Sequence, residues 1–484
     1  MRNAHYPENM QLFIDGKWID VDDRDTITIT DPSTDQELGK LPIATEEDIQ
    51  NALDSVDNAF EAWSQTSAWD RESILKRAAE LLGERKNHIA HILTLENGKP
   101  LADSQGEIDR AIETILWCAE EGKRTYGRIL PPRERLLSQS SIKRAIGPVA
   151  AFVPWNFPVV LAARKLAAAL AAGCTVVLKP AEETPASCIE LVRAFIDAGV
   201  PSGVVNLLFG IPAQISENLI QSPIIKKVSF TGSVEVGRLL ATLAAQQLKP
   251  VTMELGGHAP VVIFDDVNAD KVAKLCASFK YRNAGQVCLS PSRFYVHESL
   301  LEEFTNSFAK YASQIQVGDG LNPDVTMGPL NNSRRLHAAE NFVNQAVDAG
   351  ATVEFGGKRI GKTGNYFEPS VLSNVPPSST ILHEEPFCPI APIMSFQSFS
   401  EILPIVNKDD LGLAAYAFTN NVERAAEFSE SVEAGWIGIN HFVPALADAP
   451  IGGMKNSGLG YEGGPEGLDA YLHSKFISQH NVNY

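Results

Sequence analysis

Three polar residues, far apart in the chain, carry the side chains that a nucleophilic mechanism needs. Cys288 stands in NAGQVCLSPSR, Glu254 in TMELGGHAP and Asn156 in FVPWNFP. A thiol can attack a carbonyl carbon, a carboxylate can remove a proton, and an amide in a loop fixed by two prolines is a rigid hydrogen-bond donor. Each also has an ordinary structural explanation: a buried thiol, a solvated acid at the end of an element, and a turn-forming asparagine.

The six cysteines differ in their sequence surroundings. Four lie inside apolar stretches and are expected to be buried structural thiols: Cys118, Cys174, Cys188 and Cys276. Cys288 is the exception, because small and polar neighbours let the backbone approach a ligand closely. No CxxC pair or Cys/His cluster occurs, so the sequence predicts neither a disulfide framework nor a metal site.

The composition is that of a globular chain with an acidic surface. Lys plus Arg total 41 and Asp plus Glu total 59, which makes the formal net charge −18. This charge argues against nucleic acid or an anionic membrane as the main partner. The most apolar stretch, 159–178, is interrupted by Arg164 and Lys165, and the first residues lack the apolar core of a signal peptide. With few cysteines, we expect a soluble cytoplasmic protein.

Two stretches of alternating strands and helices must position these residues. The pattern from about 148 to 247 predicts an α/β fold with a parallel, doubly wound sheet, whose carboxyl edge would bind a nucleotide. A second alternation from about 260 to 440 predicts another α/β domain. The polar segment 124–144 and the terminal YLHSKFISQH predict a hairpin and a strand that pair with another subunit; alternatively, the tail closes its own domain.

The segment from Gly458 to Gly463 matches the GxGxxG pattern of dinucleotide-binding proteins. That fingerprint requires a strand before it and a helix that opens on its glycines. Loop-like residues precede it in this chain, so we interpret it as a glycine-rich loop. A nucleotide site in the first alternation would therefore lack this fingerprint.

Taken together, seven segments resemble the aldehyde dehydrogenase superfamily. In chain order they are PWNFP (154–158), KPAEET (179–184), FTGS (230–233), ELGGHAP (254–260), NAGQVC (283–288), EEPFCP (384–389) and APIGGMKNSGLGYEGG (449–464). The chain is most similar to the bacterial dehydrogenases of succinate semialdehyde and α-ketoglutarate semialdehyde. His258 points to that branch, because many relatives have lysine there.

The resemblance implies an aldehyde dehydrogenase-like α/β fold with two doubly wound domains and a small β oligomerisation element. Residues 1–123 and 145–254 would form a split NAD-binding domain, and 255–455 the catalytic domain. Residues 124–144 and 456–484 would form the oligomerisation element of a homodimer or homotetramer.

The resemblance also implies a catalytic sequence. Cys288 would attack an aldehyde, and the Asn156 amide with the Cys288 backbone N–H would hold the oxyanion. The thiohemiacetal would pass hydride to the nicotinamide and become a thioester, which water activated by Glu254 would hydrolyse to the free acid. The alternatives are a catalytically silent family member and a cysteine hydrolase that needs no cofactor.

NAD is the implied cofactor, with NADP possible. Lys179 and Glu182 would bind the adenosine ribose, and Ser233 at a helix N-terminus the pyrophosphate. A carboxylate at 182 should repel a 2′-phosphate, which favours NAD. Trp155 would line the cleft. The remaining predicted cofactor residues are Val153, Pro154, Gly210, Phe230, Gly232 and Leu255, with Glu385 and Phe387 at the nicotinamide end. Cys388 replaces the family's usual glycine, and no chemistry is assigned to it.

Two arginines suggest the far end of the substrate. Arg164 and Arg282 flank the predicted catalytic segments in otherwise apolar sequence, although each alone could be a solvated helix residue. Arginine at both positions resembles the semialdehyde branch, where the pair holds a carboxylate. We therefore expect a carboxylated aldehyde of about four or five carbons, with Ser290 and Phe442 shaping the pocket. The alternative is a broad-specificity enzyme for uncharged aliphatic or aromatic aldehydes.

Overall fold

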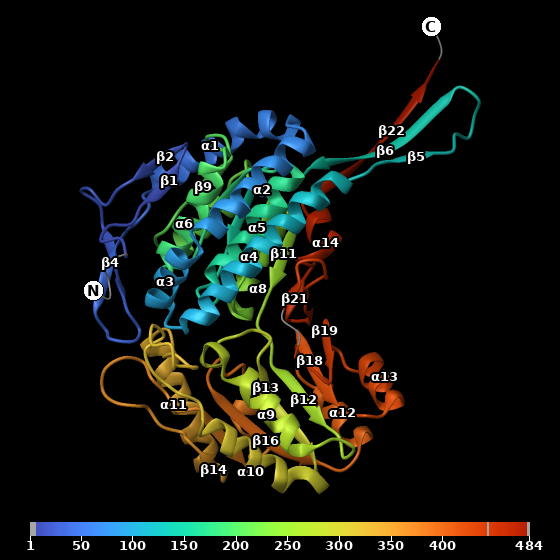
Figure 1. Cartoon of the computed structure of the whole chain (residues 1–484). Helices are drawn as coiled ribbons and strands as arrows, with labels where there is room; N and C mark the ends of the chain where they lie inside the picture. Colours follow the sequence, from blue (N-terminus) through green and yellow to red (C-terminus); the bar gives the residue numbers. More distant parts are fainter. Residues whose placement is uncertain (1–5, 443–444, 482–484) are drawn as a thin grey trace.

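The computed structural model describes residues 6–442 and 445–481, and two large sheets dominate it (Figure 1). The first sheet has the order β2 (Lys17–Ile19), β1 (Leu12–Ile14), β9 (Val205–Leu207), β8 (Val176–Lys179), β7 (Val149–Phe152), β10 (Lys227–Thr231), β11 (Val251–Glu254), β21 (Gly458–Leu459). The five strands from β9 to β11 are parallel, which confirms the predicted doubly wound sheet.

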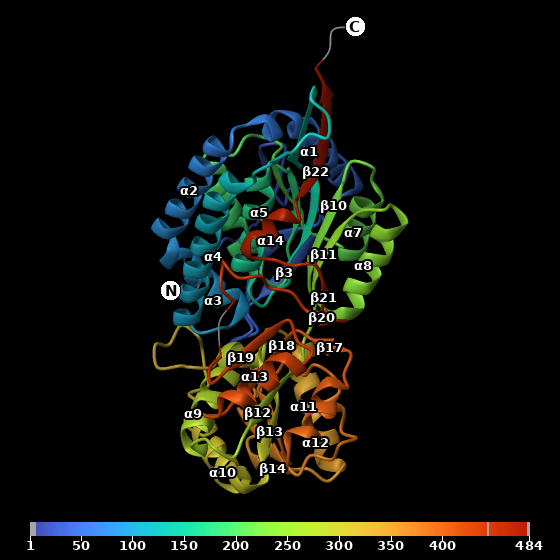
Figure 2. The same ribbon diagram turned by 90° about the vertical axis from the view of Figure 1, so that its right-hand side faces the viewer.

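Helices cover both faces of this sheet. They are α1 (Glu46–Gln65), α2 (Ala68–Glu84), α3 (Lys86–Asn97), α4 (Leu101–Glu121), α5 (Pro158–Ala172), α6 (Pro185–Asp197), α7 (Pro212–Gln221) and α8 (Val234–Gln246), with the short η1 (Gly122–Arg124) after α4. In Figure 2, α2, α3 and α4 lie outside α5 on one side, and α7 and α8 lie on the other. Thr45 caps α1 through a reciprocal capping box with Asp48.

Helix α5 fixes one end of the loop that carries Asn156; the other end of this loop is β7. Pro158 occupies its first turn, and Gly173 ends it with a φ of 91°, a conformation that suits glycine. Of its 15 residues only Arg164 is not fully buried. α5 thus carries two adjacent charged residues, the partly exposed Arg164 and the buried Lys165, in an otherwise apolar helix.

The second sheet has the order β14 (Thr352–Phe355), β15 (Ser370–Ser373), β16 (Ile390–Phe396), β13 (Pro291–His297), β12 (Ala259–Ile263), β18 (Ala414–Phe418), β19 (Trp436–Ile439). All neighbours are parallel except β14 and β15. Its helices are α9 (Ala269–Lys280), α10 (Leu301–Ala312), α11 (Ser333–Asp348), α12 (Phe399–Asn407) and α13 (Val422–Ser431), with the short η2 (Arg282–Gly285), η3 (Glu298–Leu300) and η4 (Thr380–Leu382).

A three-stranded arm projects from the body (Figure 1). It contains β5 (Arg128–Leu130), β6 (Leu137–Ala145) and β22 (Leu472–His480), in the order β22-β6-β5. The predicted hairpin and terminal strand therefore pair with each other within one chain. Exposed apolar residues remain on this arm, including Ile129 (92% exposed) and Phe476 (59% exposed).

Smaller elements complete the fold: β3 (Thr26–Thr30) with β4 (Glu37–Pro42), β17 (Leu411–Gly412) with β20 (Met454–Lys455), and α14 (Gly464–Asp469). The GxGxxG segment forms the two-residue antiparallel strand β21 and a loop, not a strand followed by a helix of the nucleotide-binding kind. β21 lies in the first sheet although the sequence groups 456–484 with the oligomerisation element. The domain boundaries stay a prediction.

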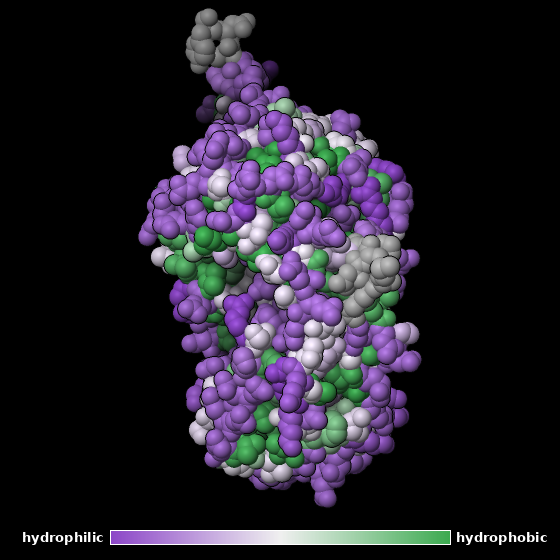
Figure 3. Space-filling model, turned by 90° about the vertical axis from the view of Figure 1, so that its left-hand side faces the viewer, coloured by the Kyte–Doolittle hydropathy of each residue, from purple (hydrophilic) through white to green (hydrophobic). Residues whose placement is uncertain are grey.

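The face drawn in Figure 3 is mostly hydrophilic, with hydrophobic side chains in separate groups. Among the described residues, no helix has both the length and the apolar character needed to cross a membrane.

Candidate active site

A cavity of about 380 Å³ lies beyond the carboxyl ends of β7, β10 and β11, against loops of the second sheet. Its lining residues are Pro154, Trp155, Asn156, Leu161, Thr231, Gly232, Ser233, Glu254, Leu255, Gly256, Cys288, Asn332, Arg334, Arg335, Glu385 and Phe387. The structure thus brings the predicted catalytic residues Cys288, Glu254 and Asn156 into one cleft, from three segments more than 30 residues apart in the sequence.

Asn156 follows β7 and is 4% exposed. Its side-chain Nδ2 donates to the carbonyl oxygen of Gln286 at 3.1 Å, two residues before the thiol. Its Oδ1 has no hydrogen-bond partner among residues 6–442 and 445–481. The amide is therefore fixed against the nucleophile segment, and the second hydrogen on Nδ2 is free for a ligand oxygen.

The segment before Cys288 departs from the sequence prediction. The pattern of KVAKLCASFKYRNAG predicts a helix that continues to Gly285, but α9 ends at Lys280. Asn283, Ala284 and Gly285 follow in the left-handed region, with φ values of 45°, 52° and 73°. At Asn283 and Ala284, which are not glycines, this backbone costs free energy and persists only because the surrounding structure holds it. The turn brings Cys288 to the cleft.

Cys288 is half-buried, whereas the other five cysteines are buried. Burial, with the nearby carboxylates of Glu254 and Glu385, raises the pKa of the Cys288 thiol to about 12, and Arg164 acts in the opposite direction. The ligand-free protein therefore holds Cys288 as a thiol that needs a base or a nearby positive charge to react.

Glu254 is the last residue of β11 and is buried. Its Oε1 has no hydrogen-bond partner in the described part of the chain. Burial raises the pKa of this carboxyl well above its usual range, and Glu462 adds to the effect, while Lys165 and Arg164 oppose it. A carboxyl group with a raised pKa is a stronger base once it is ionised.

The sequence did not single out the ion pair of Lys165 and Glu462 beside this carboxyl. Both side chains are buried and in direct contact, although 297 residues separate them. The Lys165 ammonium also donates to Ser229 Oγ at 3.1 Å. In the sequence, Lys165 served only as a break in an apolar run, and no pattern linked it to Glu462.

One wall of the cleft consists of a helix N-terminus and two glycines. Ser233 caps α8, whose N-terminus opens on the cleft, where an anion is favoured. A side chain at Gly232 would lie 2.4 Å from the Phe230 ring. One at Gly256 would lie 2.4 Å from Glu385 Oε2. The wall is therefore packed too closely at these two positions for any residue larger than glycine unless Phe230 or Glu385 moves.

Lys179, Glu182 and Gly210 form a separate group that does not line the cavity. The Lys179 ammonium lies 2.7 Å from a carboxylate oxygen of Glu182. The Gly210 backbone N–H donates to Glu182 Oε1 at 3.1 Å. This group follows β8 and β9, next to β7 in the sheet, so a ligand extending along the carboxyl edge would reach it. Val153 and Phe230 also lie outside the cavity lining.

Glu385 and Phe387 close the other end of the cleft. Glu385 Oε1 accepts the Gly257 N–H at 3.2 Å, and burial raises the pKa of Glu385 to about 7. The ring of Phe387 meets that of Trp155 edge-on at 5.7 Å. The sequence missed Asn332, Arg334 and Arg335, which line the same cleft from the start of α11.

The two predicted substrate arginines, Arg164 and Arg282, lie outside the lining of the cavity, and both act electrostatically on Arg110. Arg164 Nε has no hydrogen-bond partner among the described residues, and its charge lowers the pKa of Cys288. Arg282 Nε lies 3.9 Å from Asp103. The sequence missed a third arginine: burial lowers the pKa of Arg110 on α4, with Arg282 and Arg164 adding to the effect. Three guanidinium groups therefore share one region.

Ser290 and Phe442 lie elsewhere. Ser290 lines a separate cavity of about 10 Å³ and its hydroxyl donates to the Pro291 carbonyl at 3.4 Å. Phe442 is buried and stacks on Phe279 at 4.7 Å. Residues 443–444 of its loop lie outside the described residues.

Cys388 is fully buried, and burial raises its pKa to about 11. Within the described ranges, no cluster of three or more His, Cys, Asp or Glu could hold a metal ion.

Known proteins resemble this chain along almost its whole length. The model of the aldehyde dehydrogenase family matches residues 18–477. The 4-(hydroxymethyl)benzenesulfonate dehydrogenase of Comamonas testosteroni is 41% identical over 96% of this chain and 97% of its own length. The succinate-semialdehyde dehydrogenase (NADP(+)) of Escherichia coli K12 is 39% identical over the same shares. A structure of Staphylococcus aureus betaine aldehyde dehydrogenase in complex with NAD+ has a TM-score of 0.95 at 31% identity, covering 99% of this chain and 96% of that one.

Alkylation tests the environment of the thiol. Iodoacetamide should modify Cys288 before the five buried cysteines. With a pKa of about 12, its rate should rise about tenfold per pH unit between about pH 7 and 10. Peptide mass spectrometry at timed intervals measures this, with Cys288→Ser as the control. A rate that levels off near about pH 8 would contradict the raised pKa.

Proposed function

Because the chain belongs to the aldehyde dehydrogenase family, we propose that it oxidises an aldehyde to the free acid with NAD(P), using Cys288 as the nucleophile. The observation that carries this proposal is the meeting of a thiol, a buried carboxyl and a fixed amide in one cleft beside a helix N-terminus. A hydrolase without cofactor would have no use for a helix N-terminus that favours an anion in this cleft. A silent family member would not need an intact Cys288.

The proposed reaction starts with the loss of the Cys288 proton and attack of the sulfur on the aldehyde carbon. The Asn156 amide and the Cys288 N–H donate to the oxyanion, a contribution worth about 10²–10³ in rate elsewhere. An oxidised nicotinamide, which Glu385 and Phe387 would hold, would supply the acceptor for the hydride released as the thiohemiacetal becomes a thioester. Glu254 then removes a proton from water, which attacks the thioester and releases the acid.

Substitution of the base separates the two halves of this reaction. In Glu254→Gln, a burst of NADH should precede a steady-state rate lowered by about 10²-fold or more, because deacylation lacks its base. The ionised base becomes more abundant as pH rises, so the wild-type rate should increase with pH, over a range above that of an exposed glutamate because the pKa of Glu254 is raised. The variant should lose this increase. Stopped-flow absorbance measures both phases, and unchanged steady-state kinetics would refute the role of Glu254.

We propose that NAD is preferred over NADP. Glu182 is held by Lys179 and by the Gly210 N–H, so its carboxylate cannot turn away from a ligand at the sheet edge. A carboxylate accepts a hydrogen bond from a ribose 2′-hydroxyl and repels a 2′-phosphate. The NADP(+) relative from E. coli shows that both cofactors occur among similar proteins.

Exchange of this carboxylate tests the preference. Wild type should have the higher kcat/KM with NAD, and Glu182→Ser should reduce that advantage by about tenfold or more, the scale of one lost charge-assisted contact. Glu183→Ser is the matched control, since the neighbouring carboxylate faces Arg334 at 2.8 Å. Equal or better kcat/KM of the wild type with NADP would contradict the assignment.

We propose a substrate with an anionic tail, such as succinate or α-ketoglutarate semialdehyde. Arg164 is the one residue of α5 that is not fully buried, and Arg282 and Arg110 lie near it. Clustered guanidinium groups repel one another; Asp103, 3.9 Å from Arg282, offsets part of this cost, and an anionic substrate tail would offset more of it. Names of relatives include carboxylated and sulfonated substrates, and both kinds carry an acidic group. A broad enzyme for uncharged aldehydes is the alternative.

Truncation of either predicted arginine, Arg164→Ala or Arg282→Ala, should raise KM for the semialdehyde about tenfold or more. A charge-assisted contact contributes about 1.5–3 kcal/mol. An uncharged aldehyde of equal length is the control and should change little. A wild-type enzyme that prefers the uncharged aldehyde would make these arginines structural.

We also propose that the protein is a cytoplasmic homodimer or homotetramer. The exposed apolar side chains of Ile129 and Phe476 on the projecting arm support association through this sheet.

A further inference from the structure

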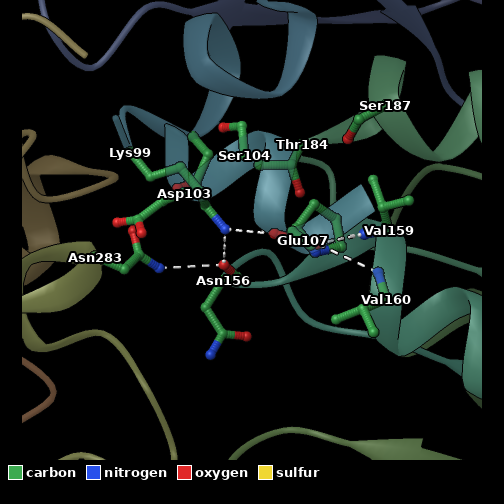
Figure 4. A network of polar contacts seen from close by, with 12 residues as sticks. Lys99, Asp103, Ser104, Glu107, Asn156, Val159, Val160, Thr184, Ser187 and Asn283 are labelled. Atoms are coloured by element: carbon green, nitrogen blue, oxygen red, sulfur yellow. Dashed lines mark hydrogen bonds and ion pairs between the residues drawn. The ribbon is translucent and has the colours of Figure 1, made fainter. Parts of the chain in front are cut away.

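Beneath the cleft lies a polar network that the proposed mechanism does not use (Figure 4). Lys99, between α3 and α4, and Glu107 on α4 form an ion pair at 2.6 Å, and both side chains are 0% exposed. The Lys99 ammonium also donates to the backbone carbonyl oxygen of Asn156 at 2.6 Å. Asn283 Nδ2 donates to the same oxygen at 3.1 Å.

The other oxygen of Glu107 binds the start of α5. It accepts the backbone N–H groups of Val159 at 2.9 Å and Val160 at 3.3 Å. N–H groups in the first turn of a helix have no acceptor within the helix. The N-cap residue of α5, Phe157, has no side-chain acceptor for them. Glu107, which is remote in the sequence, therefore caps α5, the helix that begins two residues after Asn156. Its negative charge is also favourable next to the positive end of the helix dipole.

The network thus fixes Asn156 from both sides. Its carbonyl is held by Lys99 and Asn283, and its amide is aimed at the carbonyl of Gln286. Asn283 is one of the left-handed residues before Cys288, so the same oxygen joins the oxyanion loop to the nucleophile segment. A hydrophobic pair would fill this space at a smaller desolvation cost. A buried charge pair instead specifies where one carbonyl oxygen lies.

We propose that Lys99 and Glu107 are positioning residues for oxyanion stabilisation: they orient the Asn156 amide relative to Cys288 and do not themselves touch the substrate. This inference rests on the proposed function of Asn156. Catalytic donors must be held to within a fraction of an ångström, and a misplacement of about 1 Å can cost about 10²-fold in rate.

A double-mutant cycle tests this positioning role. Asn156→Ala, Lys99→Met and their combination are compared for kcat, aldehyde KM, NAD affinity by fluorescence and thermal midpoint. Lys99→Met should lower kcat by about 10–10²-fold with NAD affinity within about twofold of wild type. The double variant should be no slower than Asn156→Ala alone, because Lys99 acts through that amide.

Arg24→Met is the control for stability. It breaks a different and less buried ion pair, with Asp48 at 2.5 Å in the capping box of α1, and Arg24 does not line the cleft. It should lower the thermal midpoint and leave kcat within about twofold of wild type. If losses multiply in the double variant, or if Lys99→Met retains full kcat, the positioning role is wrong. If Asn156→Ala itself retains kcat, the proposed function of Asn156 fails instead.

Glu107→Gln keeps the test decisive if Lys99→Met does not fold. Glutamine keeps an oxygen for the Val159 and Val160 N–H groups but removes the charge that holds Lys99. It should fold, lower kcat by about tenfold, and again add no loss to Asn156→Ala. A further loss on top of Asn156→Ala would overturn the proposal.

Discussion

The site depends on hydrogen bonds that tie two separate parts of the chain together at Asn156. Asn156 lies in the loop after β7 of the first sheet, whereas Cys288 lies in a loop before β13 of the second sheet. Asn156 Nδ2 bonds the Gln286 carbonyl, and Asn283 bonds the Asn156 carbonyl. Without these contacts, nothing in either sheet alone would set the distance between the amide and the thiol. The left-handed turn at Asn283 is the backbone cost of this arrangement.

Burial gives the site its chemistry and also sets its limits. It raises the pKa of both Cys288 and Glu254, so in the ligand-free protein the charged form of each group is disfavoured relative to an exposed one. A thiol with a raised pKa is a poor nucleophile and reacts slowly with oxidants and electrophiles. A carboxyl with a raised pKa is a stronger base once it is ionised. Arg164 and the Lys165–Glu462 pair adjust this balance from α5 and from the loop after β21. Charge in a low-dielectric site has a larger effect than it would in water.

The sequence predicts a large share of this fold and site. Strand and helix alternation predicts the parallel sheet, and the family segments bring Cys288, Glu254 and Asn156 together before any geometry is known. Buried charge pairs are not predictable in this way. Lys165 and Glu462 are 297 residues apart, and periodicity reports which face of an element is apolar, not which distant charge it meets. The end of α9 at Lys280 was missed because tertiary bonds override local helix preference there.

The central claim is that the amide of Asn156 and the thiol of Cys288 act on one carbonyl group. The most direct measurement is a crystal structure of the Glu254→Gln protein, soaked with NAD and aldehyde so that an acyl group remains on Cys288. The acyl oxygen should lie about 2.7–3.1 Å from both Asn156 Nδ2 and the Cys288 backbone nitrogen. An acyl oxygen that points away from Asn156, or an acyl group on another residue, would contradict the account.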